Sequence, residues 1–275
     1  MHIRAKKALA SFLAEDIGKG DITSSLLPRK KIFASIISRE HGILAGVQYA
    51  KQIFVLKGCR VKILKKDGSK IRPNQKIMVI SGSAQAILSC ERTALNLLSR
   101  MSGIATQTNV LVKMIRKINP KVKLYSTRKT APGLRFFDKE AVEIGGGHKH
   151  RMSLDQMVMI KDNHLVVAVS ISELIKKARK KHGRIEVEVE NLRDAIVSAR
   201  EGASIIMFDN LSPKEISKAV GTLKKLHLRD KVKLEASGGI NSKNIRSYAR
   251  TGIDMISVGK ITSSVSSLDL SLEVN

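Results

Sequence analysis

Residues 127–164 read TRKTAPGLRFFDKEAVEIGGGHKHRMSLDQMVMIKDNH, and they gather many basic side chains around a triple glycine. Arg128 follows the apolar run 122–125, and Lys161 closes the apolar run 157–160, so each cation stands where a short buried strand is expected to end. Cations at the carboxyl ends of parallel strands indicate a negatively charged ligand. A solvated loop, the ordinary interpretation of a charge run, explains this placement less well.

From residue 122 onward, short apolar runs alternate with segments of helical spacing. The expected strands are 122–127, 157–161, 185–190, 205–210, 232–237 and 255–259, and helices are expected at 171–181, 192–201, 213–226 and 242–251. This alternation implies right-handed crossovers and a parallel sheet, either open or closed into a barrel. Polar residues recur at the same end of successive strands, which favours an α/β barrel with its site at that end.

The preceding residues and the tail predict a second domain. Strands are expected at 32–38, 43–46, 61–64 and 76–80, with helices at 47–56, 85–101 and 104–118. Gly103 is expected to separate the last two helices. The tail 268–274 alternates apolar and polar residues, so it should be a strand that returns to the N-terminal sheet. The expected domains are 1–104 with 265–275, and 105–264.

The net charge is the most unusual feature of the composition. Lysine and arginine number 50 against 24 acidic residues, which gives a formal charge of +26. So basic a chain raises nucleic acid as a partner, because phosphate neutralisation supplies most non-specific affinity. Its basic residues are spread along the chain, however, and aromatic residues make up only 3%, so stacking platforms for bases are not indicated. We expect a generally basic surface and no dedicated nucleic-acid partner.

Hydropathy and cysteine content bear on the compartment. Hydrophobic residues make up 43% of the 275 residues, and no stretch approaches the roughly 18 apolar residues of a membrane span. Cys59 and Cys90 match no metal or redox spacing and are interpreted as buried thiols. These features favour a soluble protein of the reducing cytoplasm, with no membrane partner.

Acidic side chains occupy alternate positions of the expected strands. A buried carboxylate that lacks a cation or a metal is strongly unfavourable. Cations at neighbouring strand ends are one solution. A divalent ion held by Glu188 and Asp209 is another, since hard oxygen ligands beside phosphate favour Mg²⁺. The carboxylates in question are Glu186, Glu188, Glu190, Asp209 and Glu235, and the nearby cations are Arg128, Lys129 and Lys161.

The last third of the chain contains a candidate phosphate cradle. Ser237, Gly238 and Gly239 lead from an expected strand to the start of a helix, where free backbone N–H groups can bind an anion. Gly259 follows the next strand, with Lys260 beside it. Barrels commonly bind phosphate at the loops after their last two strands, so the two glycine motifs in this order are moderately specific.

Taken together, the motifs resemble the quinolinate phosphoribosyltransferase family, and the resemblance covers nearly the whole chain. The stretches that carry it are EDIGKGDIT at 15–23, REHGILAG at 39–46, ERTALN at 91–96, TRKT at 127–130, GGG at 145–147, HR at 150–151, IKDNH at 160–164, EVEV at 186–189, FDN at 208–210, EASGG at 235–239 and SVG at 257–259.

The resemblance implies a function and an architecture. The function is transfer from phosphoribosyl pyrophosphate (PRPP) to quinolinate with decarboxylation, giving nicotinate mononucleotide, pyrophosphate and CO2 in de novo NAD biosynthesis. The architecture is an N-terminal open sandwich domain and an incomplete α/β barrel of the seven-stranded type. The resemblance also implies a homodimer, or a higher oligomer of dimers, in which one subunit covers the barrel mouth of its neighbour.

The resemblance assigns site residues as well. Lys161, Glu188 and Asp209 are the expected catalytic residues, and Glu188 and Asp209 are also expected to hold Mg²⁺. The expected quinolinate pocket comprises Arg92 from the partner chain, Arg128, His150, Arg151 and Lys161. The expected PRPP site comprises Lys129, Glu188, Asp209, Ser237, Gly238, Gly239, Gly259 and Lys260.

Alternatives and one departure remain. Molybdenum-transport-associated relatives share the glycine pattern, but the run 161–164 favours quinolinate; nicotinate phosphoribosyltransferase is a weaker alternative. A basic nucleic-acid-binding protein, from a different class, would show no turnover. Many members of the family carry a histidine where Ser263 stands, so Lys260 is the candidate replacement for that phosphate contact.

Overall fold

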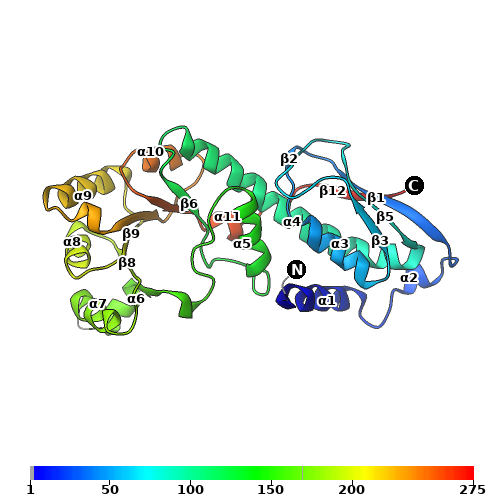
Figure 1. Cartoon of the computed structure of the whole chain (residues 1–275), viewed down its shortest axis with the longest axis horizontal. Coiled ribbons are helices and arrows are strands. Elements are labelled where there is room, and N and C mark those ends of the chain that lie inside the picture. Colours follow the sequence, from blue (N-terminus) through cyan, green and yellow to red (C-terminus); the bar gives the residue numbers. More distant parts are fainter. Residues whose placement is uncertain (1–2, 169) are drawn as a thin grey trace. The chain divides into compact units, whose positions relative to one another are not determined.

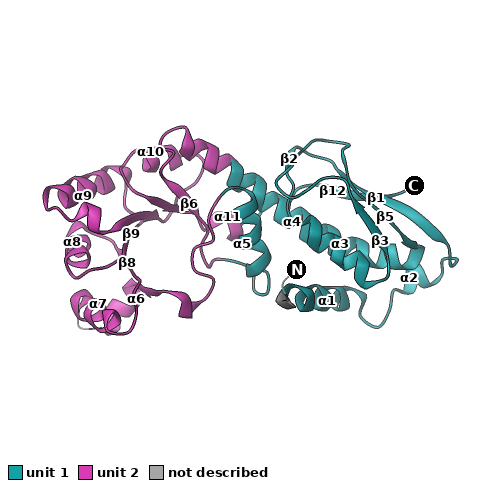
Figure 2. Ribbon diagram, in the orientation of Figure 1, with its two compact units in different colours: residues 1–109, 130–146, 264–275 teal, residues 110–129, 147–263 magenta. Residues whose placement is uncertain are grey.

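The computed structural model describes residues 3–168 and 170–275. Contacts between Cα atoms divide the chain into two compact units, coloured teal and magenta in Figure 2. Unit 1 contains residues 1–109, 130–146 and 264–275, and unit 2 contains residues 110–129 and 147–263. The division expected from the sequence did not include the return of residues 130–146 to the first unit.

Unit 1 is built on an antiparallel sheet with the order β12-β1-β5-β3. Its strands are β1 (Lys31–Ser38), β3 (Arg60–Ile63), β5 (Lys76–Ser83) and β12 (Leu270–Val274), and a small second sheet joins β2 (Gly42–Ile43) to β4 (Lys70–Ile71). The helices grouped with it are α1 (Ile3–Ile17), α2 (Ile22–Ser25), α3 (Val47–Leu56), α5 (Arg135–Ile144) and most of α4 (Ala84–Arg116). β12 pairs with β1, with Leu272 opposite Ile36, so the predicted return of the tail is confirmed.

The predicted break in the long helix is wrong, because α4 continues through Gly103 as one helix of 33 residues. A Cβ atom at Gly103 would lie 2.0 Å from the carbonyl oxygen of Ser266. The missing side chain therefore admits the backbone of the tail against the helix and does not end the helix. A glycine inside a helix costs about 1 kcal/mol relative to alanine, and this close approach accounts for its presence.

Unit 2 is a parallel sheet with the order β6-β11-β10-β9-β8-β7. Its strands are β6 (Lys123–Tyr125), β7 (Val158–Ile160), β8 (Ile185–Val189), β9 (Ile205–Asp209), β10 (Lys233–Ser237) and β11 (Met255–Ser257). All six were predicted, with ends that differ by a few residues at most. An isolated parallel bridge joins His148 to Tyr125 on β6. Six strands and one bridged residue thus lie side by side in parallel, and the incomplete α/β barrel is confirmed.

The connections between these strands are mostly helical. They are η1 (Leu154–Gln156), α6 (Asp162–Val167), α7 (Ile171–Arg179), α8 (Leu192–Arg200), α9 (Pro213–Lys225), η2 (Arg229–Lys231), α10 (Ile245–Ala249) and α11 (Lys260–Ser263). Figure 1 shows α7, α8 and α9 along the outer side of β8 and β9. The Ser212 side chain caps α9 by accepting from the backbone N–H of Glu215. This helical cover buries the outer faces of the strands and leaves their carboxyl ends for a site.

The described residues also bear on the expectations about membrane spans and cysteines. None of their helices is long and apolar enough to cross a membrane. Cys59 and Cys90 are both free and buried, as predicted. Burial, with a smaller contribution from Cys59, raises the pKa of the Cys90 thiol to about 12.

Candidate active site

All six parallel strands of unit 2 deliver a predicted site residue at or just beyond their carboxyl ends. Glu188, Asp209 and Ser237 lie within the last two residues of β8, β9 and β10. The strand register sets Ser237 directly beside Asp209. Beyond the other strand ends come Arg128 and Lys129 after β6, Lys161 after β7, and Gly259 and Lys260 after β11. The sheet therefore brings residues of both predicted substrate sites to one edge, where barrels place their active sites.

Arg128 and Arg151 form the cationic part of this edge. Both are half-buried, and the Nε atom of Arg128 is buried without a hydrogen-bond partner among the described residues. The Arg151 guanidinium donates to the carbonyl oxygen of Met157 and to Sδ of Met159, both at 3.1 Å. Burial lowers the pKa of Arg151, and the positive charge of Arg128 lowers it further. Two cations held this close favour an anion between or beside them.

The carboxylates at the edge have separate partners. Lys161 Nζ forms an ion pair with Oε2 of Glu188, as the sequence suggested for a strand carboxylate beside a strand-end cation. Asp209 is half-buried, and its Oδ2 accepts a hydrogen bond of 2.7 Å from the side-chain amide of Asn210. Asn210 was quoted in a motif but not predicted as a site residue. Its left-handed backbone, with φ of 55°, is seen only in the structure, so the sequence carried no signal for this residue.

Among the glycines of the predicted cradle, Gly238 is required by both space and conformation, Gly239 by conformation alone, and Gly259 only by a close neighbour. Gly238 has φ of 87°, and a Cβ atom there would lie 2.1 Å from Oδ1 of Asn210. Gly239 has φ of 62° and is exposed, with no atom within 4 Å of its missing Cβ. A Cβ at Gly259 would meet Cδ of Lys129 at 3.0 Å. Gly239 thus leaves backbone and open space at the edge, as a phosphate site needs.

Lys129 and Lys260 complete the rim on the side of β6 and β11. Both side chains are exposed. Lys260 is the first residue of α11, and Thr262 of the same helix donates to the Lys129 carbonyl oxygen at 2.8 Å. This hydrogen bond ties the loop that bears Lys129 to the loop that bears Gly259. Ser263, at the last position of α11, is also exposed.

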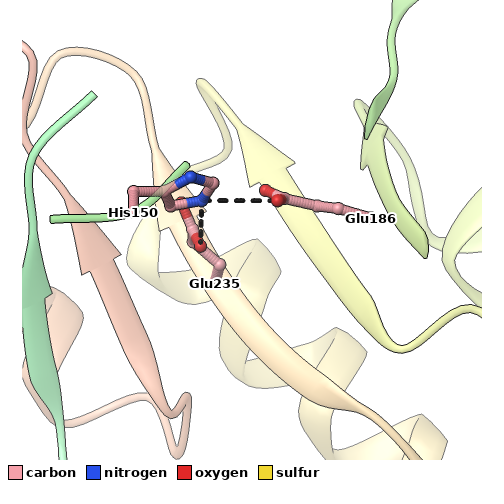
Figure 3. A group of neighbouring side chains, drawn as sticks. All are labelled: His150, Glu186 and Glu235. Carbon is pink, nitrogen blue, oxygen red and sulfur yellow. Dashed lines mark ion pairs between the residues drawn. The ribbon is translucent and has the colours of Figure 1, made fainter. Parts of the chain in front are cut away.

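His150 does not lie with the exposed cations, because its imidazole turns toward two glutamates. Its Nε2 is 3.3 Å from Oε2 of Glu186 and 3.6 Å from Oε2 of Glu235, and both glutamates are fully buried. Figure 3 shows the three side chains pointing toward one another. The expectation that Arg128, Lys129 or Lys161 neutralises the strand carboxylates is therefore wrong for these two. Strand alternation indicated that Glu186 shares a face with Glu188, and Glu235 with Ser237, but not how deep the two glutamates lie.

The protonation of this cluster follows from its surroundings. Burial alone lowers the pKa of His150, but the carboxylates of Glu186 and Glu235 outweigh it and raise that pKa to about 9. Burial likewise raises the pKa of Glu186, against the opposing effect of His150. The backbone N–H of Arg151 donates to Nδ1 of His150 at 2.8 Å, which leaves Nε2–H facing the carboxylates. Because Nδ1 accepts this hydrogen bond, the ring itself is uncharged, and the additional proton that the raised pKa values of His150 and Glu186 indicate lies on the carboxylate side of the cluster.

Arg92, the remaining predicted residue, belongs to unit 1. It is exposed on α4 and lines a groove of about 470 Å³ with Asn96, Ser99, Arg100 and the tail segment 267–270. Its assignment to the pocket of a partner subunit stays a prediction.

Comparison with known proteins identifies the family that shares this arrangement. The model of the quinolinate phosphoribosyl transferase C-terminal domain matches residues 104–273, and that of the N-terminal domain matches residues 21–102. A probable nicotinate-nucleotide pyrophosphorylase (carboxylating) of Archaeoglobus fulgidus is 46% identical over 93% of this chain and 98% of its own length. The rat nicotinate-nucleotide pyrophosphorylase (carboxylating) is 36% identical over 96% of this chain and 89% of its own length.

Solved structures agree with these matches. The nicotinate-nucleotide pyrophosphorylase of Francisella tularensis superimposes with a TM-score of 0.92 at 39% identity, covering 99% of this chain and 96% of that one. The corresponding structure from Ehrlichia chaffeensis gives a TM-score of 0.93 at 37% identity, covering 100% of both chains.

Proposed function

The chain belongs to the quinolinate phosphoribosyl transferase family, and from this premise we propose which of its side chains bind the two substrates and carry the reaction. That reaction transfers the phosphoribosyl group of PRPP to quinolinate with loss of CO2. It yields nicotinate mononucleotide and pyrophosphate in NAD biosynthesis, as the names of the family and of its curated relatives imply.

Arg128 and Arg151, with Lys161, bind the two carboxylates of quinolinate. The observation that carries this proposal is the buried Nε of Arg128, a donor without an acceptor, close enough to Arg151 for its charge to lower the pKa of that residue. Buried polar groups normally have partners, so an unpaired guanidinium donor in a cationic site favours an anionic ligand. A planar dicarboxylate matches the fork geometry of arginine.

PRPP binds along the rim formed by Lys129, Ser237, Gly238, Gly239 and Gly259. The support is the pair of left-handed glycines at the end of β10 and the close approach of Gly259 to Lys129. Backbone N–H groups exposed by such glycines bind phosphate oxygens, and a lysine adds charge. Lys260 is a further candidate contact because it is exposed at the start of α11.

Mg²⁺ is proposed as the metal that accompanies PRPP. Magnesium is usually held by one or two carboxylates together with substrate phosphates and water, so Asp209 and Glu188 fit it chemically. Asp209 is the better candidate ligand, because Lys161 already pairs with Glu188. When bound, the ion would neutralise charge on the pyrophosphate as it departs.

The reaction then needs no nucleophilic side chain. The pyridine nitrogen of quinolinate forms a bond to the anomeric ribose carbon as the bond from that carbon to pyrophosphate breaks. The carbon is cationic in the transition state, and the carboxylates of Glu188 and Asp209 stabilise that charge. The bond between the ring and the adjacent carboxylate next breaks to release CO2. Its electron pair stays on the ring carbon beside the cationic nitrogen, and that carbon takes up a proton.

An assay with labelled substrate tests the proposal. Purified protein is supplied with PRPP, Mg²⁺ and quinolinate labelled in the carboxylate next to the ring nitrogen. We expect labelled CO2 and nicotinate mononucleotide in equal amounts, and no product when nicotinate replaces quinolinate. Arg128→Ala should lose quinolinate turnover, whereas Arg193→Ala, a change of an exposed arginine on α8, should retain it. Product from nicotinate alone would contradict the proposed specificity.

The assembly proposed from the resemblance is a homodimer in which Arg92 of the partner subunit completes the quinolinate pocket. Complementation tests it: mixing inactive Arg92→Ala subunits with inactive Lys161→Ala subunits should restore activity, because a mixed dimer contains one intact site. Continued inactivity after demonstrated subunit exchange would exclude a shared site.

We also propose that the protein is cytoplasmic, since its two free thiols suit a reducing compartment.

A further inference from the structure

Three titratable side chains meet inside the parallel sheet, away from the exposed rim. Glu186 lies on β8, Glu235 lies on β10, and His150 comes from the irregular segment before η1 (Figure 3). Both glutamates are 0% exposed and the His150 side chain is 7% exposed. Within the described residues, neither carboxylate accepts a hydrogen bond of ordinary geometry, so the contacts with Nε2 of His150 are their compensation.

The surroundings make this compensation necessary. Met157, Ile205 and Met255 form a buried cluster inside the unit, with Tyr125 and Met159 packed against it. Met255 and Glu235 are register partners on neighbouring strands, as are Ile205 and Glu186. Carboxylates among methionine and isoleucine side chains are costly unless a cation or a proton neutralises them. Two buried glutamates are therefore a poor choice for packing alone, and a specific role accounts for them better.

The backbone of His150 shows where this role lies. Its φ of 52° is left-handed, a conformation that is unfavourable for a residue with a side chain. The following N–H, from Arg151, donates to Nδ1 of the same imidazole. The ring is thus engaged on both nitrogens: Nε2 faces the two carboxylates, and Nδ1 faces the backbone of Arg151. It connects the interior of the sheet to the residue that presents a guanidinium to the site.

We propose that Glu186 and Glu235 are positioning residues for quinolinate binding, which hold the His150 imidazole and thereby fix the left-handed turn that directs Arg151 into the pocket. This inference rests on the proposed function, in which Arg151 serves the quinolinate site. The two glutamates act through His150 and do not contact substrate.

Their effect should accordingly be specific. Glu235→Gln or Glu186→Gln keeps the shape of the side chain but weakens the hold on Nε2–H. We expect each to weaken quinolinate binding several-fold, and the double variant to weaken it roughly tenfold or more, because the contacts of Nε2 with two carboxylates at 3.3 and 3.6 Å are then lost. The Michaelis constant for PRPP should stay within about twofold, because, in the described part of the chain, the glutamates share no contact with the residues assigned to PRPP. Glu190→Gln, an exposed change just beyond the same strand β8, is the matched control and should leave both constants unchanged.

The decisive measurement is a mutant cycle by calorimetric titration with quinolinate. His150→Gln should weaken binding about as much as the double glutamate variant. Adding Glu235→Gln in the His150→Gln background should then change the dissociation constant by less than about twofold. Equal effects of Glu235→Gln in both backgrounds would overturn the inference, because the glutamate would not act through His150.

A second readout does not need folded variants of the cluster. Proton NMR of the native protein should show an imidazole N–H of His150 that exchanges slowly with solvent, assigned by its absence in His150→Gln or, if that variant does not fold, by selective histidine labelling. Lack of such a resonance would overturn the inference. If His150→Gln binds quinolinate normally, the proposed role of His150 fails; if it binds weakly while both glutamate variants bind normally, only the positioning role fails.

Discussion

Arg151→Ala offers the sharpest test of how the site recognises quinolinate. The substitution removes a guanidinium that donates to the Met157 carbonyl oxygen and to Met159 Sδ, and whose pKa is lowered by burial and then by the charge of Arg128. In the free protein the two cations repel each other, so their favourable contribution appears when an anion binds. The loss should therefore fall mainly on the complex.

The magnitude follows from the kind of contact that is lost. A hydrogen bond to a charged group contributes about 1.5–3 kcal/mol, so Arg151→Ala should weaken quinolinate binding by roughly ten- to hundred-fold. Arg151→Lys keeps the charge without the planar fork, so its affinity for quinolinate should lie between those of Arg151→Ala and the native protein. The Michaelis constant for PRPP should change little, because that substrate is assigned to the other part of the rim.

Calorimetric titration of quinolinate into the purified variants measures this directly. Arg193→Ala, exposed on α8, controls for a general change of charge on this basic protein. If Arg151→Ala bound quinolinate as well as Arg193→Ala does, the carboxylates of the substrate could not lie at this guanidinium. The division of the site into a cationic quinolinate pocket and a phosphate rim would then have to be abandoned.

Three other changes have defined outcomes. Glu188→Gln should lower kcat while quinolinate affinity stays within a few-fold, since its carboxylate acts where positive charge develops; loss of binding in a titration would refute this. Gly103→Ala should lower the free energy of unfolding in urea by about 2 kcal/mol, because its Cβ would meet the Ser266 carbonyl oxygen at 2.0 Å. The control Gly221→Ala, which has open space around its Cβ in α9, should raise that free energy by up to about 1 kcal/mol. The raised pKa of His150, about 9, adds stability that is fully present below its ordinary pKa of 6.5 and is lost as pH rises through 9, so unfolding free energy should fall across this range less steeply in His150→Gln than in the native protein.

The strands and the edge that carries the site could be predicted because both depend on local sequence. An apolar run bounded by polar residues specifies a buried strand, and the residue after it is placed at the carboxyl end by chain direction alone. Arg128, Lys161 and Asp209 were assigned to one edge in this way, and the structure brings them there. The pairing of the tail with β1 was predictable for a related reason, since a strand of period two needs a partner sheet.

Contacts between distant segments could not be predicted in the same way. Gly103 sits in a sequence that equally suits the end of one helix or the interior of a longer one, and the deciding contact comes from Ser266 in the tail. Residues 130–146, which include α5, follow a strand of unit 2 but group with unit 1. Buried Asp138 of α5 pairs there with Arg100 of α4 through two hydrogen bonds of 2.8 and 2.9 Å. Neither charge pattern nor spacing indicates such a partner.

The expectation that strand-end cations neutralise all the strand carboxylates failed for Glu186 because of its depth within the sheet. Alternation places Glu186 and Glu188 on one face, but two residues along a strand separate them by roughly 6–7 Å. Lys161 at the strand end reaches Glu188 and not the layer below. Glu186 therefore needs a proton donor carried inward, and the left-handed segment at His150 brings Nε2 to 3.3 Å from its carboxylate. The unit thus stacks two charged layers: the upper one meets the substrates, and the lower one fixes the turn from which Arg151 reaches them.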